Sequence, residues 1–167
     1  MRYFALLAVL CFAMALPAWA ADVQDFELKD LAGDDVELDD LLEDCNLLVL
    51  AFWEVGCVPC TEQLTHLQEY YDEYEEQGVE FVVISATPSM LLAKVEPFFK
   101  QMEFTFRVLE DVDREVTTDY GIKAPPAVFV ISPDKDMLYQ HYGYKAGQEK
   151  EVKAVIDEYL EGLEEDE

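Results

Sequence analysis

Two closely spaced cysteines follow an apolar run in the stretch Phe52-Trp53-Glu54-Val55-Gly56-Cys57-Val58-Pro59-Cys60. The run itself, residues 47–53, is rich in Leu, Val and Phe and is too short for a helix. It therefore predicts a strand that is buried on both faces of a sheet. Gly56 permits a sharp turn after this strand. Cys57 then caps a helix in which Cys60 lies one turn further on, on the same side.

The cysteine spacing indicates a redox-active disulfide, Cys57–Cys60, because one helical turn gives roughly the 5.5 Å between Cα atoms that an unstrained disulfide prefers. A free thiol has a pKa of about 8.5, so an attacking sulfur needs its negative charge stabilised at neutral pH. The helix dipole and the unpaired N–H groups of the first turn stabilise an anion at Cys57, and Pro59 is tolerated there for the same reason. We therefore expect Cys57 to be the catalytic nucleophile and Cys60 the resolving thiol.

Other interpretations of the same pair remain open at this point. The two cysteines would also suit a structural disulfide of an exported protein, or a soft-metal module such as a Cu(I) chaperone. A zinc site fits less well, because zinc takes four ligands and the sequence has no second closely spaced pair of Cys or His. Disulfide exchange itself requires neither a cofactor nor a metal, so we expect none.

The first 20 residues have the pattern of a secretory signal peptide. Arg2 precedes an apolar stretch, residues 3–16, and the small-residue site Ala18-Trp19-Ala20 follows. Cleavage there would place one domain, residues 21–163, in the periplasm or another extracytoplasmic compartment, whereas an uncleaved segment would anchor it to the membrane. Residues 164–167 are all acidic and predict a solvated, disordered tail.

The sequence is strongly acidic, with 37 Asp and Glu against 11 Lys and Arg and a formal net charge of −26. This charge excludes nucleic acid and anionic membrane surfaces as partners. It suits a surface adapted to high salt, a basic protein partner, or solubility alone. Glu54 and Glu62 flank the cysteines, and Lys123 is the only cation that we expect near them.

Three further side chains have simpler interpretations. Cys45 precedes the central strand and is interpreted as a buried free thiol, with a resolving or regulatory role as the alternative. His66 and His141 are expected to be ordinary surface or boundary residues rather than a base or a ligand.

The rest of the chain predicts alternating strands and helices. A small hairpin opens it, with strands at 26–28 and 36–38 around the turn Ala32-Gly33-Asp34. The elements that follow are a helical turn at 39–42, helix 57–77, strand 79–85, a helix over 95–102, strand 104–109, helix 112–120, strands 127–131 and 137–142, and a final helix over 152–163. This order predicts an α/β fold in which a parallel and an antiparallel half share one sheet, with helices on both faces.

These landmarks resemble the extracytoplasmic thioredoxin-like proteins of the TlpA/ResA type over nearly all of the mature chain. The resemblance rests on the opening at 26–38, Phe52-Trp53 ahead of Cys57-Val58-Pro59-Cys60, an inserted helix and strand at 90–109, Tyr120-Gly121-Ile122, and Pro126 followed by Phe129-Val130-Ile131-Ser132.

The resemblance implies a thioredoxin-like fold, a mixed central β-sheet with helices on both faces, an N-terminal hairpin and an inserted helix and strand. It implies that Pro126 is cis beside the cysteines, and that Pro125, Pro126, Trp53 and Pro59 position the substrate. It also implies a thiol-disulfide oxidoreductase that acts outside the cytoplasm on a protein disulfide, often that of an apocytochrome. A membrane or soluble electron donor would reduce the enzyme again.

Four positions depart from the pattern of the family. Gly56 replaces the Trp that usually precedes the first cysteine, and Ala51 replaces an acidic or amide residue beneath the pair. Thr61 replaces a basic residue and Thr65 replaces a proline of the following helix.

Peroxiredoxins share the opening and the fold, but their nucleophile follows a Thr-x-x-Cys pattern. Here Glu54 occupies that Thr position, so peroxidase activity fits poorly.

Overall fold

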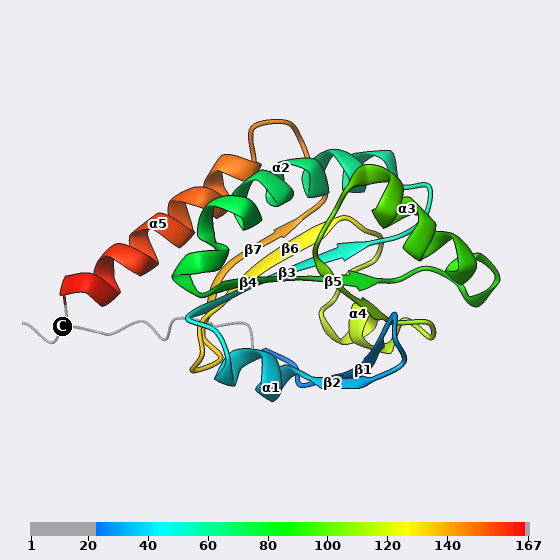
Figure 1. Cartoon of the computed structure of the whole chain (residues 1–167), viewed down its shortest axis with the longest axis horizontal. Helices are drawn as coiled ribbons and strands as arrows, with labels where there is room; N and C mark the ends of the chain where they lie inside the picture. Colours follow the sequence, from blue (N-terminus) through cyan, green and yellow to red (C-terminus); the bar gives the residue numbers. More distant parts are fainter. Residues whose placement is uncertain (1–22, 166–167) are drawn as a thin grey trace, which may run out of the picture.

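Seven strands form one mixed sheet in the computed structural model, which describes residues 23–165 (Figure 1). Their order is β2-β1-β5-β4-β3-β6-β7, in which β3, β4 and β5 are parallel and the other neighbours are antiparallel. The predicted mixed α/β sheet is confirmed, and the predicted signal peptide, residues 1–20, lies outside the described residues. The strands are β1 Glu27–Asp30, β2 Asp35–Glu37, β3 Leu47–Trp53, β4 Val79–Ser85, β5 Arg107–Glu110, β6 Ala127–Ile131 and β7 Met137–Tyr142.

Strand β3 lies at the centre of the sheet, between parallel β4 and antiparallel β6. All seven of its residues are buried, as its continuous apolar sequence predicts. Because successive side chains of a strand point to opposite faces, β3 contributes to two separate cores. One core contains Leu47, Val49, Ala51 and Trp53, and the other contains Leu48, Leu50 and Phe52.

Helices cover both faces of the sheet (Figure 1). The core on the Trp53 side is covered by α2 (Val58–Tyr74), α3 (Val95–Met102) and α5 (Glu149–Glu165), and the opposite core by α1 (Leu38–Glu43) and α4 (Glu115–Asp119). The structure also has two 3₁₀ helices. One, η1 (Glu75–Gln77), directly follows α2, and the other, η2 (Ser89–Lys94), directly precedes α3. Within residues 23–165, no helix combines the length and the apolar character that a membrane crossing requires.

The observed elements differ from the predicted ones at several ends. Strand β5 begins at Arg107 rather than at residue 104, because its pairing with β4 starts only there. Helix α4 is shorter than the predicted 112–120, and α5 continues through Glu165. The first two residues of the predicted disordered tail, 164–167, are therefore helical. Pro97 lies in the first turn of α3, where its missing N–H removes no helical hydrogen bond.

A buried carboxylate sets the start of α4. The Asp111 side chain is only 2 % exposed and accepts hydrogen bonds from the backbone N–H of Val116 (3.3 Å) and Thr117 (2.7 Å) and from Thr117 Oγ1 (2.5 Å). The backbone N–H of Asp111 in turn donates to the Ser85 carbonyl at 3.0 Å. Asp111 therefore fixes α4 to the end of β4, on the edge of the sheet where the cysteines lie.

We expect Asp111→Ala to lower the free energy of unfolding by about 2 kcal/mol, because it leaves buried donors of α4 without an acceptor. Chemical denaturation of Asp111→Ala and of Asp113→Ala, an exposed neighbour, measures the difference. The control should stay within about 0.5 kcal/mol of the unmodified protein. Equal stability of the two variants would show that the Asp111 hydrogen bonds contribute little.

Candidate active site

A β-turn joins β3 to the cysteines. The Cys57 N–H donates to the Glu54 carbonyl at 3.2 Å, which closes a turn over residues 54–57. Gly56, the third residue of this turn, has a φ of +89°, which favours glycine because L side chains are strained there. The turn geometry thus accounts for glycine at position 56.

Cys57 caps the N-terminus of α2. Its backbone is extended (φ −80°, ψ 101°), and its Sγ accepts a hydrogen bond from the Cys60 N–H at 3.3 Å. The two cysteines form a disulfide with their Cα atoms 5.3 Å apart. Cys57 is half-buried, whereas Cys60 is 0 % exposed. The pair is therefore asymmetric, with one sulfur that a partner can approach and one sulfur sealed in the core.

The proline loop lies directly beside the disulfide. The Pro125–Pro126 peptide bond is cis, and the Pro125 carbonyl oxygen is 3.9 Å from Cys57 Sγ. The Pro126 carbonyl accepts a hydrogen bond from the Gly143 N–H at 2.7 Å, which ties the loop to the end of β7. Pro125 is half-buried, and Pro59, in the first turn of α2, is exposed. Pro125 and Pro59 thus leave surface open beside Cys57, whereas Pro126 is buried behind Pro125.

Trp53 is buried at the end of β3, as the predicted strand requires, and this burial bears on its expected role in positioning the substrate. Its side chain is 0 % exposed and stacks on Phe98, with ring centroids 5.0 Å apart, while Phe99 packs edge-on at 5.2 Å. Its indole N–H has no hydrogen-bond partner among the described residues. A fully buried ring cannot touch a docked polypeptide, so Trp53 does not position a substrate by contact. It supports the site from below, through the core that it shares with α3 and Cys60.

Hydrogen bonds connect the segments that follow the parallel strands β3 and β4. The Ala86 N–H donates to the Trp53 carbonyl at 2.8 Å, and the Val55 N–H donates to Thr87 Oγ1 at 3.1 Å. Thr87 is 0 % exposed and also accepts from the Ser85 hydroxyl at 2.9 Å. The turn before Cys57 is therefore held by the segment after β4, which sequence reasoning did not single out.

Arg114 brings a cation to the site that the sequence analysis missed. Its Nη1 donates to Glu54 Oε2 at 2.9 Å and to the Ala86 carbonyl at 3.2 Å, and both charged side chains are 34 % exposed. The expectation that Lys123 is the only nearby cation is therefore wrong. The sheet topology could have revealed Arg114. This residue follows β5, and the carboxyl ends of neighbouring parallel strands meet at one edge of the sheet.

Cys45 lies at the opposite end of β3 from the disulfide, a strand length of about 20 Å away. Burial, and after it the nearby Glu80 carboxylate, raises the pKa of the Cys45 thiol to about 11. A protonated thiol at this distance cannot resolve a disulfide at Cys57. The interpretation of Cys45 as a free thiol is confirmed, although it is half-buried rather than fully buried.

The two histidines lie outside the site. His66 is 40 % exposed and lies 3.7 Å from a Glu69 oxygen one turn along α2, and His141 stacks on Tyr139 in β7. Both are boundary residues, as predicted. Within residues 23–165, no group of three or more His, Cys, Asp or Glu side chains is arranged to hold a metal ion.

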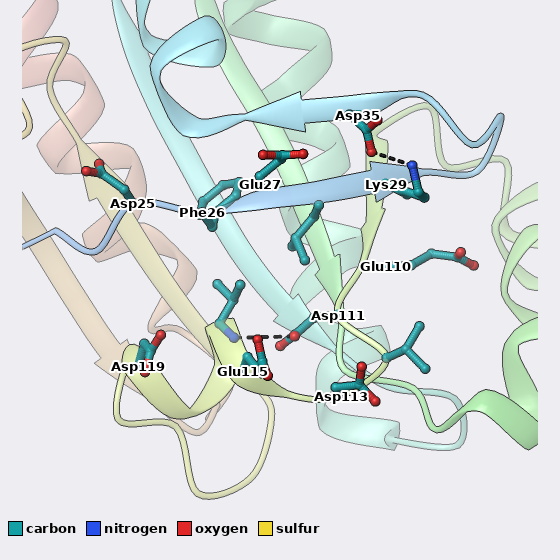
Figure 2. A pocket seen from close by; sticks show the side chains of 13 residues that line it. Asp25, Phe26, Glu27, Lys29, Asp35, Glu110, Asp111, Asp113, Glu115 and Asp119 are labelled. Carbon is teal, nitrogen blue, oxygen red and sulfur yellow. Dashed lines mark hydrogen bonds and ion pairs between the residues drawn. The ribbon is translucent and has the colours of Figure 1, made fainter.

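An acidic hollow of about 580 Å³ lies between β1, the end of β5 and α4 (Figure 2). Lys29 forms an ion pair with Asp35 at one side of it. The other charged side chains of its lining are carboxylates, namely Asp25, Glu27, Glu110, Asp111, Asp113, Glu115 and Asp119. Such a surface repels anions, in keeping with the overall charge of the chain.

Comparison with known proteins identifies the family. The AhpC/TSA family matches residues 20–140. The chain belongs to the AhpC/TSA family. It is 29 % identical to the thiol-disulfide oxidoreductase ResA of Halalkalibacterium halodurans over 137 residues. This alignment covers 82 % of this chain and 72 % of the relative.

Solved structures share the fold. A putative thiol:disulfide interchange protein DsbE from Chlorobium tepidum superposes with a TM-score of 0.74 at 23 % identity, over 84 % of this chain and 96 % of that one. The peroxidoxin BcpB from Mycobacterium tuberculosis superposes with a TM-score of 0.69 at 26 % identity, over 86 % of this chain and 96 % of that one. In this AhpC/TSA protein, Glu54 lies three residues before Cys57 and its carboxylate is paired with Arg114. With a Cys57–Cys60 disulfide and ResA relatives, it is a thiol-disulfide oxidoreductase of thioredoxin-like fold.

The geometry of the proline loop leads to one prediction. Pro125 has no N–H to offer an extended peptide, although its carbonyl faces Cys57. We expect Pro125→Thr to stabilise a peptide bound through Cys57 by about 1 kcal/mol, the net value of one hydrogen bond. The measurement is the equilibrium between a cysteine peptide and 2-mercaptoethanol for the mixed disulfide at Cys57 in a Cys60→Ser background.

Pro125→Ala serves as the matched control, because it restores the same backbone N–H with a different side chain. Both variants should shift the equilibrium toward the mixed disulfide between Cys57 and the peptide by roughly fivefold. No shift, or a shift with Thr alone, would argue against strand-like docking at this loop.

Proposed function

We propose that this protein is an exported thiol-disulfide oxidoreductase that reduces disulfides in a partner protein. The observation that carries the proposal is the asymmetry of the pair at the N-terminus of α2. Cys57 is the half-buried helix cap beside Pro125, and Cys60 is sealed behind it. Exchange needs such an arrangement, because one sulfur must meet the partner while the other waits within reach of the first.

The reaction begins from the dithiol form of the pair. The Cys57 thiolate attacks one sulfur of the substrate disulfide, which forms a mixed disulfide and releases the other substrate sulfur as a thiolate. Cys60 loses its proton and attacks Cys57 Sγ, which forms the Cys57–Cys60 disulfide and releases the second substrate thiolate. Two electrons and two protons pass to the substrate in total. A membrane or soluble electron donor must then return two electrons to the pair.

The partner that suits this site is a protein with an accessible disulfide in an extended segment. An extended segment is able to lie along Pro125, next to the buried Pro126, while its sulfur meets Cys57. The net charge of −26 favours a basic partner, and an apocytochrome is the substrate that we consider first. Export to the periplasm or another extracytoplasmic compartment rests on the N-terminal sequence, residues 1–20, which would anchor the domain if it were not cleaved.

Trapping of mixed disulfides tests the order of attack. We expect Cys60→Ser to accumulate mixed disulfides with partner proteins, because the second step is blocked while Cys57 still attacks. Cys57→Ser should trap few or none at the site, since Cys60 is buried, and any adduct at the half-buried Cys45 is identified by its peptide. Nonreducing electrophoresis and mass spectrometry of the trapped species read out the result. Equal trapping by the two variants would refute the assignment, and Cu(I) binding without any trapping would favour the soft-metal alternative.

A further inference from the structure

Arg114 occupies an unusual backbone position to reach the site. It has a φ of +59° in the segment between β5 and α4, a left-handed conformation that is uncommon for residues other than glycine. From there its guanidinium bridges the two neighbouring loops, with hydrogen bonds to Glu54 Oε2 and to the Ala86 carbonyl. One side chain thus joins the ends of all three parallel strands.

Glu54 belongs to the β-turn that leads into Cys57. Its carbonyl accepts the Cys57 N–H, and the Cα atoms at the two ends of such a β-turn lie less than about 7 Å apart. A carboxylate in the turn next to Cys57 opposes the formation of a second negative charge on the Cys57 sulfur. The pairing with Arg114 offsets that opposition, because the ion pair as a whole has no net charge.

Other charged groups lie on the elements around Cys57. Glu62 is exposed in the first part of α2, Lys123 is exposed on the proline loop, and Asp113 is exposed beside Arg114. Exposed charges are screened by solvent, so their effect on Cys57 is smaller than that of a charge held in the adjoining turn. Glu54 and Arg114 are both about two-thirds buried.

We propose that Arg114 is a positioning residue that neutralises Glu54 and so keeps the Cys57 thiol acidic enough to attack. The inference rests on the proposed role of Cys57 as the nucleophile. Arg114 does not touch the substrate. It acts through Glu54, by holding the turn before Cys57 and by cancelling the charge that this turn carries.

The test is the pH dependence of iodoacetamide alkylation at Cys57 in the Cys60→Ser background, read by mass spectrometry of the Cys57 peptide. Arg114→Asn removes the charge, and Asn tolerates the left-handed conformation, so folding should be retained. We expect this variant to raise the Cys57 pKa by about one unit and to slow alkylation at neutral pH by up to about tenfold. Arg114→Lys should leave the pKa close to its starting value.

A charge cycle separates electrostatics from loop structure. Glu54→Gln alone should lower the Cys57 pKa, since it leaves the Arg114 charge unpaired. The double variant, Glu54→Gln with Arg114→Asn, should return the pKa to within a few tenths of a unit of the starting value. Asp113→Asn, a control in the same segment whose charge change has the same size and the opposite sign, should shift the Cys57 pKa by a few tenths of a unit at most. The shift in Arg114→Asn should also shrink in 1 M salt, where the Debye length is about 3 Å.

Several outcomes would overturn the proposal. An unchanged or lowered pKa in Arg114→Asn would show that Glu54 does not act on Cys57. A raised pKa that the double variant fails to restore would assign Arg114 a purely structural role. Failure here is distinguishable from failure of the proposed function, because trapping by Cys60→Ser is measured with Arg114 intact. If Cys60→Ser traps mixed disulfides but Arg114→Asn leaves the Cys57 pKa unchanged, the proposed function stands and only the role of Arg114 is rejected.

Discussion

The site depends on the burial of β3 along its whole length. Because both faces of Leu47–Trp53 are covered, the strand cannot slide or twist without exposing one of two cores, and its end is fixed in space. The turn at Glu54–Cys57 and the first turn of α2 then follow in a defined direction. The helix terminus that stabilises an anion at Cys57 is thus placed by the hydrophobic core rather than by the site residues themselves.

The loops at the carboxyl ends of the parallel strands bring together the residues that surround Cys57. Parallel strands β3, β4 and β5 end together, so Glu54, Ala86 and Arg114 meet although they are far apart in sequence. Their hydrogen bonds hold the turn before Cys57, while the proline loop closes the site from the antiparallel side. In a chain with a net charge of −26, the local pairing of Glu54 with a cation is the feature that protects thiolate formation.

The sequence predicted the central elements well because their signals are continuous. Strands β4, β6 and β7 have the predicted bounds, since each is an apolar or alternating run between turn residues. The cysteines and prolines were found because their spacing carries the chemistry. Arg114 and Thr87 were missed because their roles arise from loop contacts across the sheet edge. The burial of Trp53 followed from the apolar strand, but its cover by α3, which keeps it from a docked polypeptide, was not visible in the sequence.

The central claim is that Cys57–Cys60 is an exchanging pair and not a structural bond. The reduction potential of this disulfide tests it most directly, by equilibration of the full chain with glutathione or dithiothreitol buffers and quantification of the free thiols. We predict a value between about −270 and −120 mV, the range of thioredoxin-like exchangers. A potential below about −300 mV, typical of structural disulfides, would contradict the account.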